Sequence, residues 1–115
     1  EEAKKTYPNL KANFHFFVGD IAIAKRALLL GCTMSFDGPI TFARDYDEVI
    51  RMLPLESIMA ETDAPFASPE PYRGKRCEPW MVSEIVEKIA EIKEITVEEV
   101  ANILRLNAIK MFQIK

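Results

Sequence analysis

Three short segments of this sequence end in a residue of a type that binds metal ions: His15, Asp37 and Asp63. Each segment is a predicted strand, and ligands in parallel α/β proteins bind at the carboxyl ends of the strands. An imidazole and a carboxylate at one edge of a sheet suit Zn²⁺ or a similar divalent ion. Considered singly, such a histidine is more often a core or capping residue, and an aspartate before a turn more often shapes that turn.

A second carboxylate, Glu61, lies two residues before Asp63, so in an extended strand both side chains face the same way. Glu61 then needs a cationic partner, and the loop that follows carries Arg73, Lys75 and Arg76. These cations could pair with Glu61 through a bidentate contact or hold the phosphates of a nucleic-acid substrate. An ordinary solvated loop would explain the same charges equally well.

Alternating strand and helix patterns predict how these residues are positioned. The predicted strands cover 11–17, 32–37 and 57–63, and the predicted helices between them cover 21–30 and 46–53. Asp20 and Asp45 are expected to cap the two helices, and Gly31 is placed to end the first. Strand, helix, strand, helix and strand within about 55 residues indicate βαβ units with parallel strands and right-handed crossovers.

Two more helices are predicted after a long loop. The loop, residues 66–78, is too long to be a simple connector, so we expect it to have a functional role. Pro79 suits the first turn of a helix that runs to about Glu94. Thr96 and Glu99 form a predicted capping box for the last helix. That helix should bury one stripe, formed by Val97, Val100, Leu104 and Met111.

Composition limits the class of protein. A length of 115 residues suits one compact domain and is too short for a two-domain enzyme. The net charge of −3 argues against a broadly basic nucleic-acid-binding surface, so such contact would need a local patch. No apolar run is long enough to span a membrane and no signal-peptide pattern is present, so we expect a cytoplasmic protein without membrane contact.

The metal-binding residue types are few. Cys32 and Cys77 lie far apart, in neither a disulfide framework nor a zinc-ligand spacing, and are expected to be free thiols. His15 is the single histidine, so this chain alone cannot complete a site built on several imidazoles. The first residue is not methionine, which suggests a cloning boundary, a processed end or a piece of a longer protein.

Several motifs are recognisable together. The sequence E-T-D-A-P at 61–65, with P-Y-R-G-K-R-C-E-P at 71–79, resembles the E-T-D-[AS]-P … R-G-K-x-N-x-P signature of the TatD family of metal-dependent deoxyribonucleases. The segment 14–20 is similar to the family's F-H-x-F-S-G, 35–38 to its S-F-S-G, and 107–112 to its N-A-x-x-x-F. Order and spacing match over nearly the whole chain, which corresponds to about the last half of a family member.

This resemblance implies a fold and a site. The fold would be α/β, the last three βα units of a (β/α)₈ TIM-type barrel (β-α-β-α-β-α-α), with 1–115 as the C-terminal portion of the hydrolase barrel. His15 and Asp63 would be metal ligands, and Asp63 would also accept a proton from the attacking water. The cofactor would be a divalent metal, Mg, Mn or Zn, with two ions in the complete site. Further candidates for positioning or substrate binding are Glu61, Arg73, Lys75, Arg76 and Asp37.

The sequence also departs from the family. The family's first-strand H-x-H, its central Glu and its fifth-strand His have no counterpart here. Val18, Asp37 and Cys77 stand where the family has Ser, Ser and Asn. Asp37 could add an acidic ligand or repel a phosphate.

Two functions are therefore open. In the first, the complete protein hydrolyses phosphodiester bonds of DNA exonucleolytically, acting on single strands or 3′ ends. This chain would supply part of the di-metal site and be inactive alone. In the second, the chain is a non-catalytic βα module that keeps the scaffold and acts in assembly or nucleic-acid contact. In both, the open strand edges favour association with the missing barrel half or with another copy of the chain.

Overall fold

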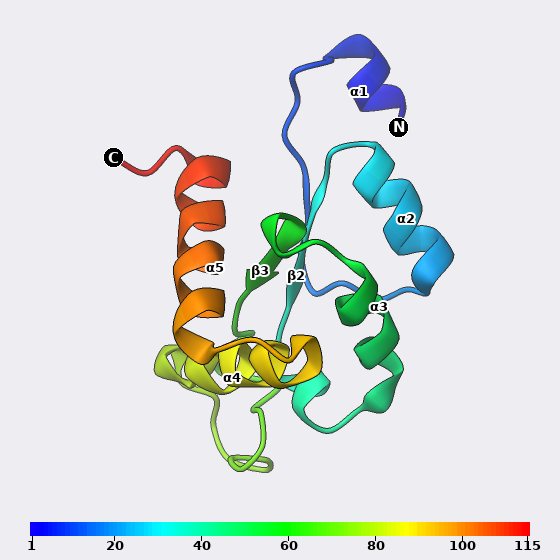
Figure 1. Ribbon diagram of the computed structural model, residues 1–115. Helices are drawn as coiled ribbons and strands as arrows, with labels where there is room; N and C mark the ends of the chain where they lie inside the picture. Colours follow the sequence, from blue (N-terminus) through cyan, green and yellow to red (C-terminus); the bar gives the residue numbers. More distant parts are fainter.

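A parallel three-stranded sheet lies at the centre of the structure, a computed structural model that describes residues 1–115 (Figure 1). The strands are β1 (Asn13–Phe14), β2 (Thr33–Phe36) and β3 (Ile58–Ala60), and their order in the sheet is β1-β2-β3. Helices connect successive strands, as βαβ units require. The predicted α/β class and parallel topology are confirmed.

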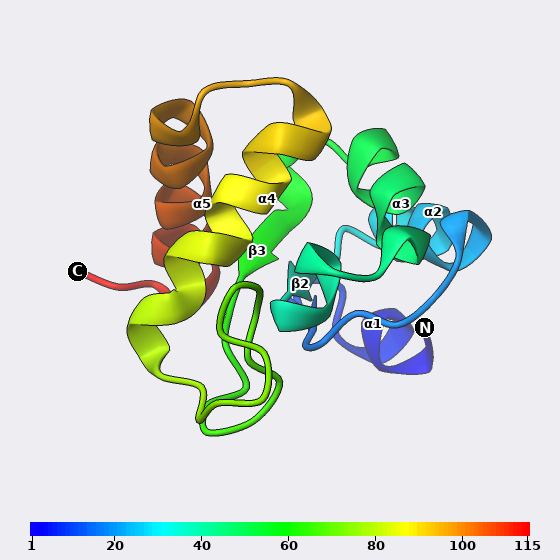
Figure 2. The ribbon, with the colours of Figure 1, turned by 90° about the horizontal axis from the view of Figure 1, so that it is seen from below.

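The α-helices pack around this sheet. Figure 2, which views the molecule from below, shows α2, α3 and α4 in an arc on one side of β2 and β3. None of the helices is long and apolar enough to cross a membrane. Their bounds are α1 (Glu2–Thr6), α2 (Ile21–Leu29), α3 (Asp47–Met52), α4 (Val82–Lys93) and α5 (Val97–Phe112). Short 3₁₀ turns cover Gly38–Thr41, Arg44–Tyr46, Leu55–Ser57 and Pro79–Met81.

The two faces of the sheet differ in polarity because side chains alternate along a strand. Met34 and Phe36 are buried in the apolar core, which also includes Ile58 from β3 and residues of α2 to α5. On the other face, Thr33 donates a hydrogen bond to Asn13 Oδ1 (2.8 Å), and Asn13 Nδ2 donates one to Ser35 Oγ (2.8 Å). The sheet therefore has an apolar face toward the helices and a polar face away from them.

Several local predictions are confirmed. Asp20 caps α2 by accepting a hydrogen bond from the backbone N–H of Ile23 (2.9 Å), and Gly31 takes the positive φ of +67° that follows the end of the helix. Thr96 caps α5 by accepting a hydrogen bond from the N–H of Glu99. Cys32 and Cys77 are free, as predicted.

Other local predictions are wrong. Asp45 does not cap α3, because it lies in the 3₁₀ turn Arg44–Tyr46 and the helix starts only at Asp47. Val97 is exposed rather than buried, because it opens α5 at the short turn after α4 and borders a surface depression beside Ile95. Val100 and Leu104 do form the buried stripe of α5.

The strands are shorter than predicted. The first covers only Asn13–Phe14, because the chain turns away at Phe16, whose φ is +48°. The third covers Ile58–Ala60, so Glu61 and Asp63 lie in the segment beyond it. The predicted site residues thus follow the strand ends and do not lie within the strands.

At the opposite, amino-terminal end of the strands, Asn107 joins α5 to β3. Its side-chain Nδ2 donates hydrogen bonds to the carbonyl oxygens of Leu55 (2.7 Å) and Ile58 (2.8 Å). Asn107 is buried, so if its amide is removed, water does not take over the two hydrogen bonds to these carbonyl oxygens.

We predict that Asn107→Ala lowers the free energy of unfolding by about 1–3 kcal/mol, because two carbonyl groups lose a buried donor. Urea unfolding monitored by circular dichroism measures this change. The matched control, Asn102→Ala, removes an exposed amide of the same helix and should change stability by less than about 0.5 kcal/mol. Equal effects of the two substitutions would contradict the assigned role of Asn107.

Candidate metal centre

His15 lies between two carboxylates at the carboxyl ends of the strands. Its Nδ1 is 2.7 Å from Glu61 Oε1, and its Nε2 is 3.8 Å from Asp63 Oδ1. The same Glu61 oxygen accepts a hydrogen bond from the backbone N–H of Phe16 (2.8 Å). Because parallel strands end at the same edge of the sheet, residues beyond β1 and β3 meet beside the end of β2.

Glu61 sets the charge and orientation of the His15 ring. Its hydrogen bond and its negative charge raise the pKa of His15 above the usual value. In the neutral ring, the proton stays on Nδ1 to be donated to Glu61, and the lone pair of Nε2 is left facing Asp63. A carboxylate behind the histidine is the usual arrangement around a metal-binding imidazole, since it fixes the ring and makes it more basic.

The spacing of the two free atoms fits a shared cation. Two ligand atoms bound at about 2.1 Å to one ion lie about 3.0–4.2 Å apart for ligand angles of 90–180°. The 3.8 Å between His15 Nε2 and Asp63 Oδ1 falls within this range. The structure contains no group of three or more His, Cys, Asp or Glu side chains arranged to hold a metal ion. His15 and Asp63 thus remain two candidate ligands, and a complete centre would need more groups than this pair.

Asp37, directly after β2, lies beside these residues with no counter-charge of its own. It is only 3% exposed, and its Oδ2 has no hydrogen-bond partner. Burial, followed by repulsion from Glu61 and Asp63, raises the pKa of Asp37 to about 7. A buried carboxyl group that has one unpaired oxygen and lies close to two other carboxylates fits a site that receives a cation.

The loop from 64 to 78 packs tightly over the end of β2. A Cβ atom on Gly38 would stand 1.9 Å from the carbonyl oxygen of Ala67, so only glycine allows this approach. The backbone N–H of Glu70 donates a hydrogen bond to Thr41 Oγ1 (2.9 Å), which ties the loop to the turn after β2. The glycine that follows Asp37 therefore positions the loop beside the candidate ligands.

The basic residues of the loop do not pair with Glu61. Arg73 instead places its guanidinium over the ring of Phe42, 3.5 Å from the ring centroid. Arg76 lies 3.4 Å from Glu78, and Lys75 is exposed. The interpretation that a loop cation pairs with Glu61 is wrong: the contacts of Glu61 Oε1 are with His15 and the backbone N–H of Phe16, while Arg73 and Arg76 contact other groups. Sequence reasoning missed Phe42, and an aromatic residue in the turn after the second strand was its only signal.

We predict that the pKa of His15 lies above 6.5 and falls toward that value in Glu61→Gln, because the substitution removes the negative charge beside Nδ1. The single histidine makes a proton NMR titration of the ring unambiguous. The control Glu70→Gln, an exposed carboxylate elsewhere, should leave the titration unchanged. A His15 titration that is identical in Glu61→Gln and the unmodified chain would refute the contact.

We predict that Asp37→Asn stabilises the chain by about 2–4 kcal/mol at pH 8 and has little effect at pH 4. The folded pKa of about 7 lies above the usual 3.8, so proton uptake by Asp37 stabilises the fold at low pH. This stabilisation is lost as the pH rises from about 4 to about 7. Urea unfolding of Asp37→Asn between pH 4 and pH 8 measures this change, with Asp45→Asn as the control. A gain in the free energy of unfolding that does not depend on pH would contradict the raised pKa of Asp37.

Comparison with known proteins supports the expected resemblance. The model of the family described as TatD related DNase matches residues 1–113. The chain is 42% identical over 102 residues to the metal-dependent hydrolase YabD of Bacillus subtilis, covering 87% of this chain and 40% of YabD. It is 37% identical to the metal-dependent hydrolase YcfH of Escherichia coli, covering 87% of this chain and 38% of YcfH. The chain thus spans about two fifths of the length of these curated relatives.

Solved structures agree on the fold. YjjV, a TatD homologue from Escherichia coli K12, superposes with a TM-score of 0.86 and 27% identity over 99% of this chain and 45% of YjjV. A TatD family hydrolase from Entamoeba histolytica superposes with a TM-score of 0.84 at 20% identity, over 96% of this chain and 45% of its own. The three-stranded sheet with its helices is therefore consistent with part of a TIM-type barrel.

Proposed function

The chain belongs to the TatD-related DNase family, and on that premise we propose that it supplies part of the metal-binding active site of a DNA phosphodiester hydrolase. The observation that carries the proposal is the 3.8 Å separation of His15 Nε2 and Asp63 Oδ1, with Glu61 on the other ring nitrogen. The relatives named metal-dependent hydrolases are more than twice as long as this chain, so the activity proposed is that of the longer protein.

Each site residue has a proposed role. His15 and Asp63 bind the metal, and Glu61 orients His15 as it does in the structure. These residues would hold a divalent metal, Mg, Mn or Zn, with two ions in the complete site. When bound, it would lower the pKa of its water and offset charge on the phosphodiester oxygens. Asp63 accepts the remaining proton of the attacking water. Asp37 contributes negative charge that favours the cation, once deprotonated.

The proposed substrate is DNA, as a single strand or at a 3′ end, cleaved exonucleolytically. Lys75 and Arg76 are exposed on the loop that begins at Asp63, where they are available for phosphate oxygens. Arg73, on the same loop as Lys75, packs over Phe42 of the turn after β2 and adds a third positive charge. In a chain of net charge −3, we propose these residues as the local basic patch that such a substrate requires.

The remaining ligands are proposed to come from outside these residues. The outer edges of β1 and β3 are unpaired, as expected for strands that continue a barrel. We take the three strands as the last three of the eight, with the first part of the barrel as the natural partner. A second copy of the chain is the other source of pairing strands.

We predict that Asp63→Ala or His15→Ala lowers metal-dependent cleavage of end-labelled single-stranded DNA about 100-fold or more, because each removes a metal ligand. The assay uses this chain joined behind the part of YabD that precedes the matched segment. It is run with Mg²⁺, Mn²⁺ or Zn²⁺ and with a chelator. Asp45→Ala, which removes an exposed carboxylate of the 3₁₀ turn before α3, serves as the control and should keep full activity.

Full cleavage by Asp63→Ala would overturn the role of that residue. A folded joined protein that binds metal without cleaving DNA would favour the non-catalytic module instead. The 115-residue chain alone should not cleave, because it brings only two ligands together. Cleavage by the chain alone that is lost in Asp63→Ala would mean that a second copy completes the centre.

A further inference from the structure

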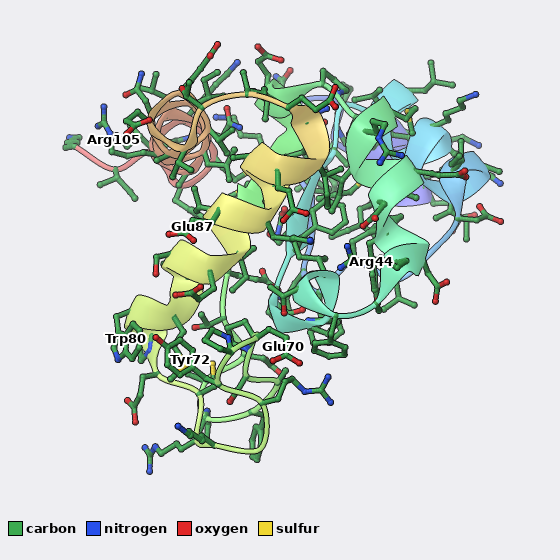
Figure 3. All side chains as sticks on the ribbon, turned by 60° about the horizontal axis from the view of Figure 1, so that its bottom comes forward. Arg44, Glu70, Tyr72, Trp80, Glu87 and Arg105 are labelled. Atoms are coloured by element: carbon green, nitrogen blue, oxygen red, sulfur yellow. The ribbon has the colours of Figure 1, made fainter.

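Three aromatic side chains are carried by the segment that follows Asp63. Trp80, in the 3₁₀ turn before α4, is 56% exposed, and Phe66 is 71% exposed. The ring of Tyr72 meets the ring of Trp80 edge to face, with centroids 5.2 Å apart. Figure 3 shows Tyr72 and Trp80 side by side where the loop joins the start of α4. None of these rings belongs to the buried core.

Backbone hydrogen bonds hold this segment in a defined shape. The N–H of Cys77 donates to the carbonyl oxygen of Pro65 (3.0 Å), which closes the base of the loop. The N–H of Tyr72 donates to Pro69 O (2.7 Å), and Ser68 Oγ donates to Lys75 O. Exposed rings on a fixed backbone lose little conformational freedom when a flat ligand stacks on them.

The charges around the rings select the class of ligand. Lys75 and Arg76 lie on the same loop as Tyr72, with Arg73 held over Phe42. Aromatic faces and cations on one loop match a single-stranded nucleic acid, whose bases stack on the rings while its phosphates meet the positive charges. A duplex hides its base faces, so it offers the rings nothing to stack on.

The position of the rings agrees with a strand that leads to the metal centre. The N–H of Phe66 donates a hydrogen bond to the carbonyl oxygen of Asp63 (2.8 Å), so the backbone of Phe66 belongs to the same turn as a candidate ligand. Trp80 begins the helix that follows the loop. Nucleotides stacked here would lie beside the scissile phosphate and not on it.

We propose that Trp80, Tyr72 and Phe66 form a base-stacking surface that binds the unpaired nucleotides of single-stranded nucleic acid beside the metal centre. The proposal rests on the proposed function for the nature of the substrate, and it adds the reason for a single-strand preference. In this proposal the three rings act in substrate binding.

Intrinsic fluorescence tests the proposal, because Trp80 is the only tryptophan of the chain. The 115-residue chain is titrated with an oligothymidylate of about eight nucleotides at about 50 mM salt, with a chelator present to prevent cleavage. We expect the oligothymidylate to quench the fluorescence of Trp80. An abasic oligonucleotide of the same length, which keeps every phosphate, should quench far less and bind about 10-fold more weakly.

Substitutions separate stacking from charge. By anisotropy of a labelled oligothymidylate, Trp80→Ala and Phe66→Ala should each weaken binding about 5- to 10-fold, whereas Trp80→Phe should retain it. The matched control is Leu29→Ala, which removes an apolar side chain that is 88% exposed on α2 and should not change binding. All these side chains are exposed, so the substitutions should leave the fold intact.

Equal affinity and quenching with the abasic oligonucleotide, or no binding of either, would overturn the stacking surface. Either result together with metal-dependent cleavage by the joined barrel would leave the proposed hydrolase standing. Base-dependent quenching in a protein whose joined barrel cleaves nothing would keep the stacking surface and refute the hydrolase instead.

Discussion

The carboxylate of Glu61 joins the two outer strands of the sheet where they end. Glu61 follows β3, and its Oε1 accepts hydrogen bonds from two groups of the segment after β1. These are the backbone N–H of Phe16 and the imidazole N–H of His15. β1 is only two residues long, so its own ladder bonds hold little of this segment. Charge-assisted hydrogen bonds to a largely buried carboxylate are stronger than neutral ones, which suits them to fix the turn at Phe16. The orientation of His15 toward Asp63 depends on this one carboxylate.

Three carboxyl groups, those of Asp37, Glu61 and Asp63, lie near this contact, and His15 is the one cationic group that faces them. His15 offsets part of the charge of Glu61 and Asp63, whereas Asp37 is buried with an unpaired oxygen and retains a proton up to about neutral pH. Such an arrangement costs stability in the absence of a cation, since like charges in a poorly solvated site repel one another. Sites that bind metals commonly carry this cost, because the binding energy of the ion offsets it. The electrostatics and the ligand geometry therefore point to the same use of the site.

Close packing places the loop after Asp63 beside the candidate ligands. Gly38 lets the backbone of Ala67 approach the end of β2, so the loop cannot move without disturbing the turn after that strand. Cations and aromatic rings on the loop are then presented from a fixed frame next to the candidate ligands. In barrels of this kind the loops usually carry the functional residues, and the rigid sheet holds the loops in position.

The sequence by itself determined the order of the strands and the helices between them, the parallel sheet, the caps at Asp20 and Thr96, and the placing of His15 and Asp63 at one edge of the sheet. These features follow from local patterns: alternation along a strand, helical periodicity, and turn or cap residues at fixed positions. The family motifs added the expected barrel. Each of these signals lies within a short stretch of chain, so it is readable without the fold.

Only the tertiary structure decided the length of β1, the partner of Arg73, and the burial and raised pKa of Asp37. The N–H of Phe16 meets a carboxylate 45 residues away, and Arg73 lies on an aromatic ring from another loop. Whether a charged side chain finds water, a counter-ion or a ring depends on the segments packed beside it. That packing is a property of the whole fold, because it joins residues whose separation along the chain carries no local pattern.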